Sequence, residues 1–221
     1  MQTVFLKNNN AENLIVFFCG WGMDIEPFKN KFDSLKNSDI CLCFDYQDVF
    51  LNTDVFKKYN NKTIIAWSLG VYIASLFADT INPERMIAIN GTLFPIDDEK
   101  GIAKNIFFST LDNISEENIA RFQRRMCGSK SSFKDYIDIK PKRSIESLKS
   151  ELKFISELYE NYSSAFITKR KWDLAVIGSK DLIFTPENQK KGWSENSQKT
   201  IIVDESHYFP AIPLLDLNLY E

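Results

Sequence analysis

The sequence predicts an α/β fold, in which a mostly parallel β-sheet is flanked by helices. Short apolar segments bounded by Gly, Asn or Asp, such as residues 14–18, are typical of strands that are buried on both faces. Helical patterns, notably over residues 69–79 and 185–193, alternate with these segments. Because alternating strands and helices form parallel sheets through right-handed crossovers, we expect one such sheet. The expected strands are residues 3–7, 14–18, 39–44, 62–67, 86–90, 173–178 and 200–203.

The alternation stops over residues 93–171, where we expect an α-helical lid inserted into a single domain of residues 1–221. Ser115 is a favourable N-cap for a first helix, and Gly128 is typical of a residue just beyond a helix end. A second helix over residues 144–159 carries apolar residues at the spacing of a core-facing stripe. No linker rich in Gly, Ser or Pro divides the chain into two domains.

The charge balance and the histidine and cysteine content exclude several classes of protein. With 27 Lys and Arg against 30 Asp and Glu, the net charge is −3, so nucleic acid is not an expected partner. The longest apolar run, residues 14–19, is far too short to span a membrane. Four cysteines without a CxxC pair predict reduced thiols and a cytoplasmic location. The single histidine excludes a multi-histidine metal site, and no metal or other cofactor is expected.

Three residues indicate nucleophilic chemistry. Ser68 lies where an apolar strand passes directly into a helix, between the small residues Ala66 and Gly70, as in the nucleophile elbow of hydrolases. Asp181 and His207 each follow a later strand. A serine nucleophile needs a base to take its proton, and a histidine base needs an acid to orient it.

Each of these residues alone has a simpler explanation. Ser68 could be part of an ordinary strand–helix turn, Asp181 a turn or N-cap residue, and His207 a solvated loop side chain. Their order decides between the two explanations, because serine, then acid, then histidine is the chain order of α/β-hydrolases. The sequence therefore predicts an α/β-hydrolase fold with these three residues as its catalytic triad.

An esterase of this kind also needs an oxyanion hole, which is a pair of N–H groups that bind the charged oxygen of the intermediate. Leu69, the residue after the nucleophile, is expected to supply one backbone N–H. Trp21 is expected to supply the other, because the flanking Gly20 and Gly22 allow the backbone to approach a ligand closely. The alternative for this segment is a tight turn with a packed indole ring.

These motifs resemble the pimeloyl-[acyl-carrier protein] methyl ester esterases of biotin synthesis, of the BioG type, over nearly the whole chain. Two departures from the usual hydrolase pattern are Ala66 in place of the first glycine of the elbow, and Cys19 where many related hydrolases have histidine. The segments that carry the resemblance are residues 18–23, 66–71, 90–92, 95–98, 101–102, 122–126, 178–181 and 206–210.

The resemblance implies a serine carboxylesterase that removes the methyl group from the ω-carboxyl of a pimeloyl chain held on acyl-carrier protein. Ser68 would attack the ester carbonyl, His207 would act as the base, and Asp181 would orient the histidine. The N–H groups of Trp21 and Leu69 would bind the oxyanion. Freeing the carboxylate would end chain elongation and release the acyl group to the next enzyme of the pathway.

The charge distribution fits an acidic carrier protein as the partner. Residues 121–153 contain ten basic and four acidic side chains, a net +6, which leaves −9 for the rest of the chain. Such a basic surface can steer an acidic protein towards the site. The alternative is a solvated face of two amphipathic helices. The candidate docking residues are Arg121, Arg124 and Arg125, which are expected to share one helical face, and Lys142 and Arg143.

Two other functions remain open on the sequence alone. Another acyl hydrolase, such as a thioesterase or a lipid or small-ester esterase, would use the same triad on a different bond. A hydrolase-like binding module that has lost its chemistry is the third possibility, and the presence of all three triad residues argues against it.

Overall fold

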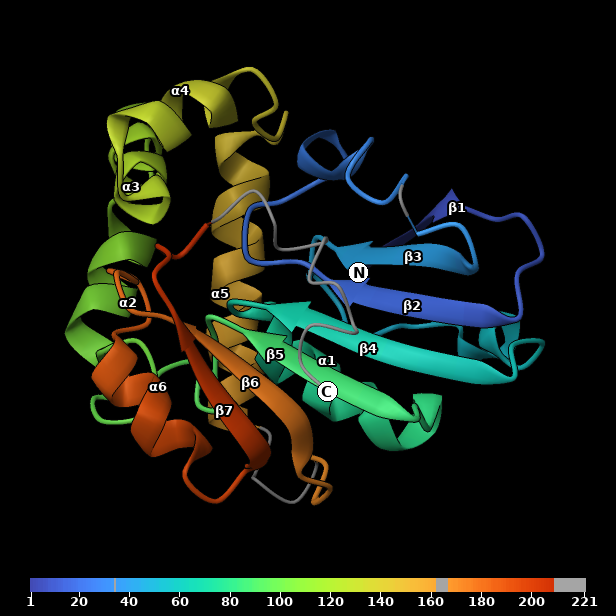
Figure 1. Ribbon diagram of the computed structural model, residues 1–221. Coiled ribbons are helices and arrows are strands. Elements are labelled where there is room, and N and C mark those ends of the chain that lie inside the picture. Colours follow the sequence, from blue (N-terminus) through green and yellow to red (C-terminus); the bar gives the residue numbers. More distant parts are fainter. Residues whose placement is uncertain (34, 162–166, 209–221) are drawn as a thin grey trace.

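The computed structural model describes residues 1–33, 35–161 and 167–208. Within these residues, seven strands form one sheet in the order β1-β3-β2-β4-β5-β6-β7 (Figure 1). The edge strand β1 is antiparallel to β3, and all other neighbours are parallel. The prediction of a mostly parallel sheet is therefore confirmed. The strands are β1 (Gln2–Lys7), β2 (Asn13–Phe18), β3 (Ser38–Phe44), β4 (Asn61–Trp67), β5 (Arg85–Ile89), β6 (Trp172–Gly178) and β7 (Ser197–Val203).

The apolar strands are continuous because both faces of the sheet are covered. Along β2, Val16 and Phe18 pack into one hydrophobic core, while Ile15 and Phe17 pack into the core on the opposite face. All four side chains have at most 2% of their surface exposed. If only one face of the sheet were covered, polar and apolar residues would alternate along each strand instead.

Helices occupy many of the segments between the strands. Short 3₁₀ helices occupy Glu26–Phe28 and Thr53–Phe56, and the α-helices are α1 (Gly70–Ile81), α2 (Lys104–Asp112), α3 (Glu116–Cys127), α4 (Lys130–Ile137), α5 (Ile145–Asn161) and α6 (Pro186–Trp193). The predicted cap of α3 is present, since the Ser115 hydroxyl accepts the N–H of Asn118 and Gly128 ends the helix with a φ of +71°. The sequence predicts α3 and α5 but misses α2 and α4. Each of these two short helices has a single fully buried side chain, Phe107 and Tyr136, so their apolar pattern is sparse.

The helices α2 to α5 all lie between β5 and β6 in the chain. Figure 1 shows α2, α3 and α4 beyond the end of the sheet to which the central strands point, with the longer α5 running past the same end. The turns after β2, β4, β6 and β7 meet at this end, which is where parallel sheets bind their ligands. That these helices form a lid on a single domain stays a prediction, and its residues 162–166 lie outside the described part of the chain.

Within the described residues, no helix combines the length and the apolar character that crossing a membrane requires.

Candidate active site

Ser68 lies in a strained turn between β4 and α1. Its φ is +59°, a conformation that residues other than glycine rarely adopt. The turn is closely packed, because a Cβ at position 70 would lie 2.3 Å from the carbonyl oxygen of Cys19. A Cβ at position 91 would lie 2.2 Å from the carbonyl oxygen of Ser68. Only glycine fits at either position, so Gly70 and Gly91 allow the turn to exist.

The structure brings Ser68, Asp181 and His207 together. Nε2 of His207 lies 2.9 Å from Oγ of Ser68, and Nδ1 lies 2.8 Å from Oδ2 of Asp181. In the neutral tautomer with hydrogen on Nδ1, the serine hydroxyl donates to Nε2 and Nδ1–H donates to the carboxylate. The three residues are 5%, 2% and 1% exposed, respectively. This arrangement can transfer a proton from the serine hydroxyl to the imidazole.

The carboxylate of Asp181 is held in place by further hydrogen bonds. Its Oδ1 accepts the backbone N–H groups of Ile183 at 2.7 Å and Phe184 at 3.0 Å. Its Oδ2 accepts the side-chain amide of Gln189 at 3.0 Å, in addition to His207. Since every hydrogen bond is donated to it, the carboxylate is fixed as an acceptor for Nδ1–H.

His207 is positioned by its backbone as well as by its ring. Its carbonyl oxygen accepts the indole N–H of Trp67 and the side-chain amide of Asn90, both at 2.9 Å. The amide oxygen of Asn90 accepts the N–H of Gly178, the last residue of β6. The imidazole stacks against the Phe184 ring at a centroid distance of 6.2 Å. Together these contacts join the ends of three strands at the histidine.

Sequence reasoning misses the roles of Trp67, Asn90 and Gln189. Each role is a hydrogen bond to a residue that is distant in the sequence or on another element, so periodicity carries no signal for it. Asn90 offers one clue, since a buried asparagine directly after a strand with a φ of +47° indicates a constrained turn. The described structure ends before residues 209 and 210 of the motif that includes His207.

The two expected oxyanion donors, Trp21 and Leu69, border the same pocket as Ser68 and His207. In the described part of the chain, neither backbone N–H donates to a protein acceptor. The indole N–H of Trp21, by contrast, donates to the carbonyl of Leu148 at 2.9 Å. That both N–H groups form the oxyanion hole stays a prediction.

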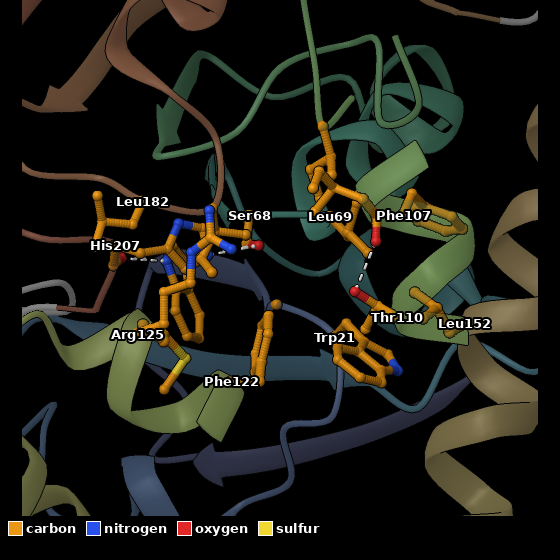
Figure 2. Close-up of a pocket in the computed structure, with 16 residues that line it drawn as sticks. Trp21, Ser68, Leu69, Phe107, Thr110, Phe122, Arg125, Leu152, Leu182 and His207 are labelled. Carbon is orange, nitrogen blue, oxygen red and sulfur yellow. Dashed lines mark hydrogen bonds between the residues drawn. The ribbon is translucent and has the colours of Figure 1, made fainter. Parts of the chain in front are cut away.

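The pocket above Ser68 is mainly apolar, and its volume is about 60 Å³ (Figure 2). Figure 2 shows His207 and Arg125 toward one end of the pocket, and Trp21 and Phe107 toward the other. Among the described residues that line it, Arg125 is the one side chain with a permanent charge. The apolar lining comes from Ile102, Ile106, Phe107, Phe122, Met126, Leu152, Leu182 and Ile183, among others.

Two larger hollows adjoin this pocket, and Phe122 borders all three. One, of about 600 Å³, shares Trp21 with the pocket, and its charged lining residues are Glu116, Glu146, Lys140 and Arg143. The other, of about 380 Å³, lies between α2 and α3 and shares Arg125 with the pocket. We call the latter the α2–α3 groove. Trp21 and Phe122 pack edge to face at 5.2 Å between the pocket and the larger hollow.

The predicted docking residues do not form one surface. Arg121 and Arg125 both line the α2–α3 groove, whereas Arg124 lies over the ring of Phe133, on α4. Arg124 therefore does not line this groove, although the i, i+3 and i+4 spacing of the three arginines keeps them on one side of the helix. Lys142 is exposed and pairs with Glu26 at 3.4 Å.

The prediction that Arg143 is a surface docking residue is wrong. Its side chain is only 7% exposed, and its guanidinium pairs with the carboxylates of Asp45 and Glu151. A charge count along the sequence cannot reveal this, because Asp45 is 98 residues from Arg143, and Glu151, although only eight residues away, looks like any other charged position. Arg143 is therefore part of a buried network of ion pairs.

Comparison with solved structures defines the class of the protein. The esterase EaEST from Exiguobacterium antarcticum is similar with a TM-score of 0.68 and 13% identity, over 99% of this chain and 90% of the other. A lipase-esterase related protein from Clostridium acetobutylicum gives a TM-score of 0.62 at 17% identity, over 99% and 95%. The fold is the α/β-hydrolase fold.

Two further comparisons identify the family within this fold. The family model described as pimeloyl-ACP methyl esterase BioG matches residues 1–214. The crystal structure of BioG from Haemophilus influenzae is similar with a TM-score of 0.85 and 32% identity, over 96% of this chain and 95% of the other. The chain belongs to the BioG family of pimeloyl-ACP methyl esterases, as the sequence motifs predict.

A second relative carries a different description. Malonyl-[acyl-carrier protein] O-methyltransferase from Bacteroides fragilis is 40% identical over 197 residues, which are 88% of this chain. These residues are only 39% of that relative, so the chain spans well under half of its length.

Proposed function

We propose that the protein hydrolyses the methyl ester of a pimeloyl chain carried on acyl-carrier protein and thereby frees the ω-carboxylate. The observation that carries this proposal is the pair of hydrogen bonds from His207 to Ser68 and Asp181, at 2.9 and 2.8 Å, in a buried pocket. Membership of the BioG family supports the methyl ester as the bond that is cleaved and the carrier-bound chain as the substrate.

The reaction proceeds in two halves. Ser68 attacks the ester carbonyl while His207 takes its proton, and Asp181 stabilises the imidazolium that forms. The N–H groups of Trp21 and Leu69 bind the oxyanion of the tetrahedral intermediate. The imidazolium gives its proton to the departing methoxide, which leaves as methanol. Water, activated by the same histidine, then hydrolyses the acyl-enzyme and restores the serine hydroxyl.

The apolar pocket supports a methylene chain as the acyl group. Side chains such as Phe107 and Leu152 offer no hydrogen-bonding partners to a substrate, so a saturated chain loses little on entering. Burial of Ser68 and His207 also excludes bulk water, which strengthens the hydrogen bonds to the developing oxyanion.

The α2–α3 groove supports an anionic carrier as the partner. It is continuous with the pocket through Thr110, Phe122 and Arg125, and its charged lining residues are Arg121 and Arg125. The larger hollow has a balanced charged lining instead, in which Glu116 and Glu146 oppose Lys140 and Arg143. Its Arg143 is enclosed in ion pairs with Asp45 and Glu151, whereas the pair of Arg121 with Glu117 is exposed to solvent. An acidic protein surface is therefore attracted more strongly to the α2–α3 groove than to the larger hollow.

The name of the Bacteroides fragilis relative also supports a carrier-bound substrate. It is described as an enzyme that methylates malonyl-acyl-carrier protein, and its length beyond the matched segment exceeds this chain. Methylation of a carrier-bound diacid and hydrolysis of such a methyl ester are complementary reactions. The serine and histidine of this chain fit hydrolysis.

The test offers the purified protein methyl pimeloyl-acyl-carrier protein and measures methanol and free carrier thiol separately. Methanol release with the thioester intact is expected. Ser68→Ala should lower turnover by about 10⁴-fold or more, because the nucleophile is removed. Ser150→Ala, at an exposed position of α5, is the matched control and should be fully active. Release of the thiol in place of methanol would show a thioesterase.

A second experiment tests the partner. Arg121→Glu with Arg125→Glu should raise KM for the carrier-bound ester by about tenfold or more at low salt, with a smaller difference at high salt. Lys149→Glu with Lys153→Glu introduces the same charge change at exposed positions of α5 and should leave KM unchanged. Equal effects of the two double variants would contradict docking at the α2–α3 groove.

A further inference from the structure

Glu151 is a buried carboxylate that the proposed chemistry does not use. It lies on α5 with 0% of its surface exposed. Its Oε1 accepts the backbone N–H of Tyr46 at 3.1 Å, and its Oε2 accepts the N–H of Gly22 at 3.1 Å. Arg143 donates to the same Oε2 at 2.9 Å. Burying a charge is costly, so this carboxylate is tolerated because all of these donors surround it.

Gly22 is one of three consecutive loop residues that are attached to the start of α5. The indole of Trp21 donates to the carbonyl of Leu148 at 2.9 Å. Arg143, two residues before the helix, donates to the carbonyl of Met23 at 3.1 Å. The loop after β2 is therefore bound at three successive positions, by hydrogen bonds that do not involve its own neighbours.

The packing at this contact is tight. Gly22 has a φ of +76°, and a Cβ added there would lie 2.9 Å from a methyl group of Leu148. The N–H of Gly22 belongs to the peptide group that follows Trp21, and the indole anchors the Trp21 side chain. With both fixed, the backbone of Trp21 has little rotational freedom, and the direction of its own N–H is determined.

We propose that Glu151, together with Arg143, is a positioning residue for the oxyanion hole: by holding the N–H of Gly22 it directs the N–H of Trp21 toward the oxygen that becomes negative. This inference rests on the proposed function, which assigns the Trp21 N–H to the oxyanion. A helix of the insertion thus completes the site from outside the sheet, although it does not touch the substrate through Glu151.

The electrostatic environment of Glu151 supports this role. Desolvation raises the pKa of its carboxyl, while Arg143 and the N–H groups of Tyr46 and Gly22 oppose that rise. Three other charged or titratable groups interact with it: Asp45, which pairs with Arg143, the thiol of Cys19 and the phenol of Tyr46. Glu151→Gln keeps the shape of the side chain but replaces one acceptor oxygen by an NH₂ donor. It can then no longer accept from Tyr46, Gly22 and Arg143 together.

The experiment compares kcat and KM for a p-nitrophenyl ester in the wild type and in Glu151→Gln. We expect kcat to fall by about 10- to 100-fold with KM changed by less than about twofold, because only the transition state contains the oxyanion. A trifluoromethyl ketone, which forms a tetrahedral oxyanion with Ser68, should lose affinity by a similar factor. Glu157→Gln, at an exposed position of the same helix, is the control and should match the wild type.

An unchanged kcat in folded Glu151→Gln would overturn the proposal, and so would a rise in KM that accounts for the whole loss. If Glu151→Gln does not fold, Trp21→Phe removes the indole hydrogen bond to Leu148 but keeps an aromatic ring, and the same pattern is expected. The p-nitrophenyl ester reports Ser68 chemistry whatever the natural acyl group is. Failure of the carrier-bound methyl ester as a substrate would therefore leave this test intact.

Discussion

Helices α3 and α5 both lie between β5 and β6, yet they are attached to the rest of the protein in different ways. Six residues of α5 are buried, spread along its length, whereas α3 buries only Met126 and Cys127, in its last turn. The ion pair of Arg143 with Glu151 is enclosed, while that of Arg121 with Glu117 is exposed. Of the helices between β5 and β6, α5 therefore belongs to the framework of the candidate active site, whereas α3 forms its outer border.

The largest effect on stability is expected for Glu151→Ala. Removing one partner of a buried ion pair leaves the N–H groups of Gly22 and Tyr46 without their acceptor and Arg143 with Asp45 as its remaining carboxylate, at a cost of about 3–5 kcal/mol in the free energy of unfolding. Urea denaturation measures it. A loss below about 1 kcal/mol would mean that α5 is no more firmly attached than α3.

An intermediate effect is expected for Phe122→Ala, on α3. This ring packs on Trp21 and borders the pocket and both adjoining hollows. Its removal should cost about 1–2 kcal/mol of stability, as the loss of an aromatic pair and some apolar contact. It should also reduce discrimination between short and long acyl esters, measured as the ratio of their kcat/KM values. Phe122→Leu keeps an apolar barrier and should retain more of that discrimination; equal ratios in both variants and the wild type would contradict this role.

We expect the difference in stability between the wild type and Glu151→Gln to depend on pH. Burial raises the pKa of Glu151 above the ordinary value of 4.5, so the folded protein binds a proton there more readily than the unfolded chain. The wild type should therefore gain stability relative to the variant as the pH falls through the raised pKa towards 4.5, and lose it as the pH rises again. Urea midpoints of both proteins at a series of pH values measure this. The opposite slope would show that Arg143 and the N–H donors outweigh desolvation.

The smallest effect is expected for Glu117→Ala. Its carboxylate is 75% exposed and its partner Arg121 is 68% exposed, so water replaces the lost interaction. The urea midpoint should not change measurably. A clear loss of stability would indicate that α3 is attached through this ion pair and would remove the contrast with α5.

Much of the fold was predictable because its signals are local. The seven strands are recognisable from apolar runs between turn residues, and the capping residues Ser115 and Gly128 define α3. Ser68, Asp181 and His207 were found from their order and from the strands they follow. That their side chains meet is a finding of the structure, whereas their catalytic roles stay a prediction.

The supporting residues were not predictable in the same way. Glu151 looks like an ordinary charged position on an amphipathic helix, and its partners Gly22 and Tyr46 lie more than a hundred residues away. The sequence predicts Arg143 as a docking residue because a count of charges contains no information about burial. Asn90 and Gln189 act through side-chain amides whose partners only the folded chain brings close.

The close packing around Ser68 also has an evolutionary consequence. At positions 70 and 91, even the smallest added side chain would overlap a backbone carbonyl, so neither glycine has an acceptable single substitution. A mutational scan should find no tolerated replacement at these two codons. We expect changes in substrate preference to arise in the surrounding helices instead, where Phe122 can be replaced without moving Ser68.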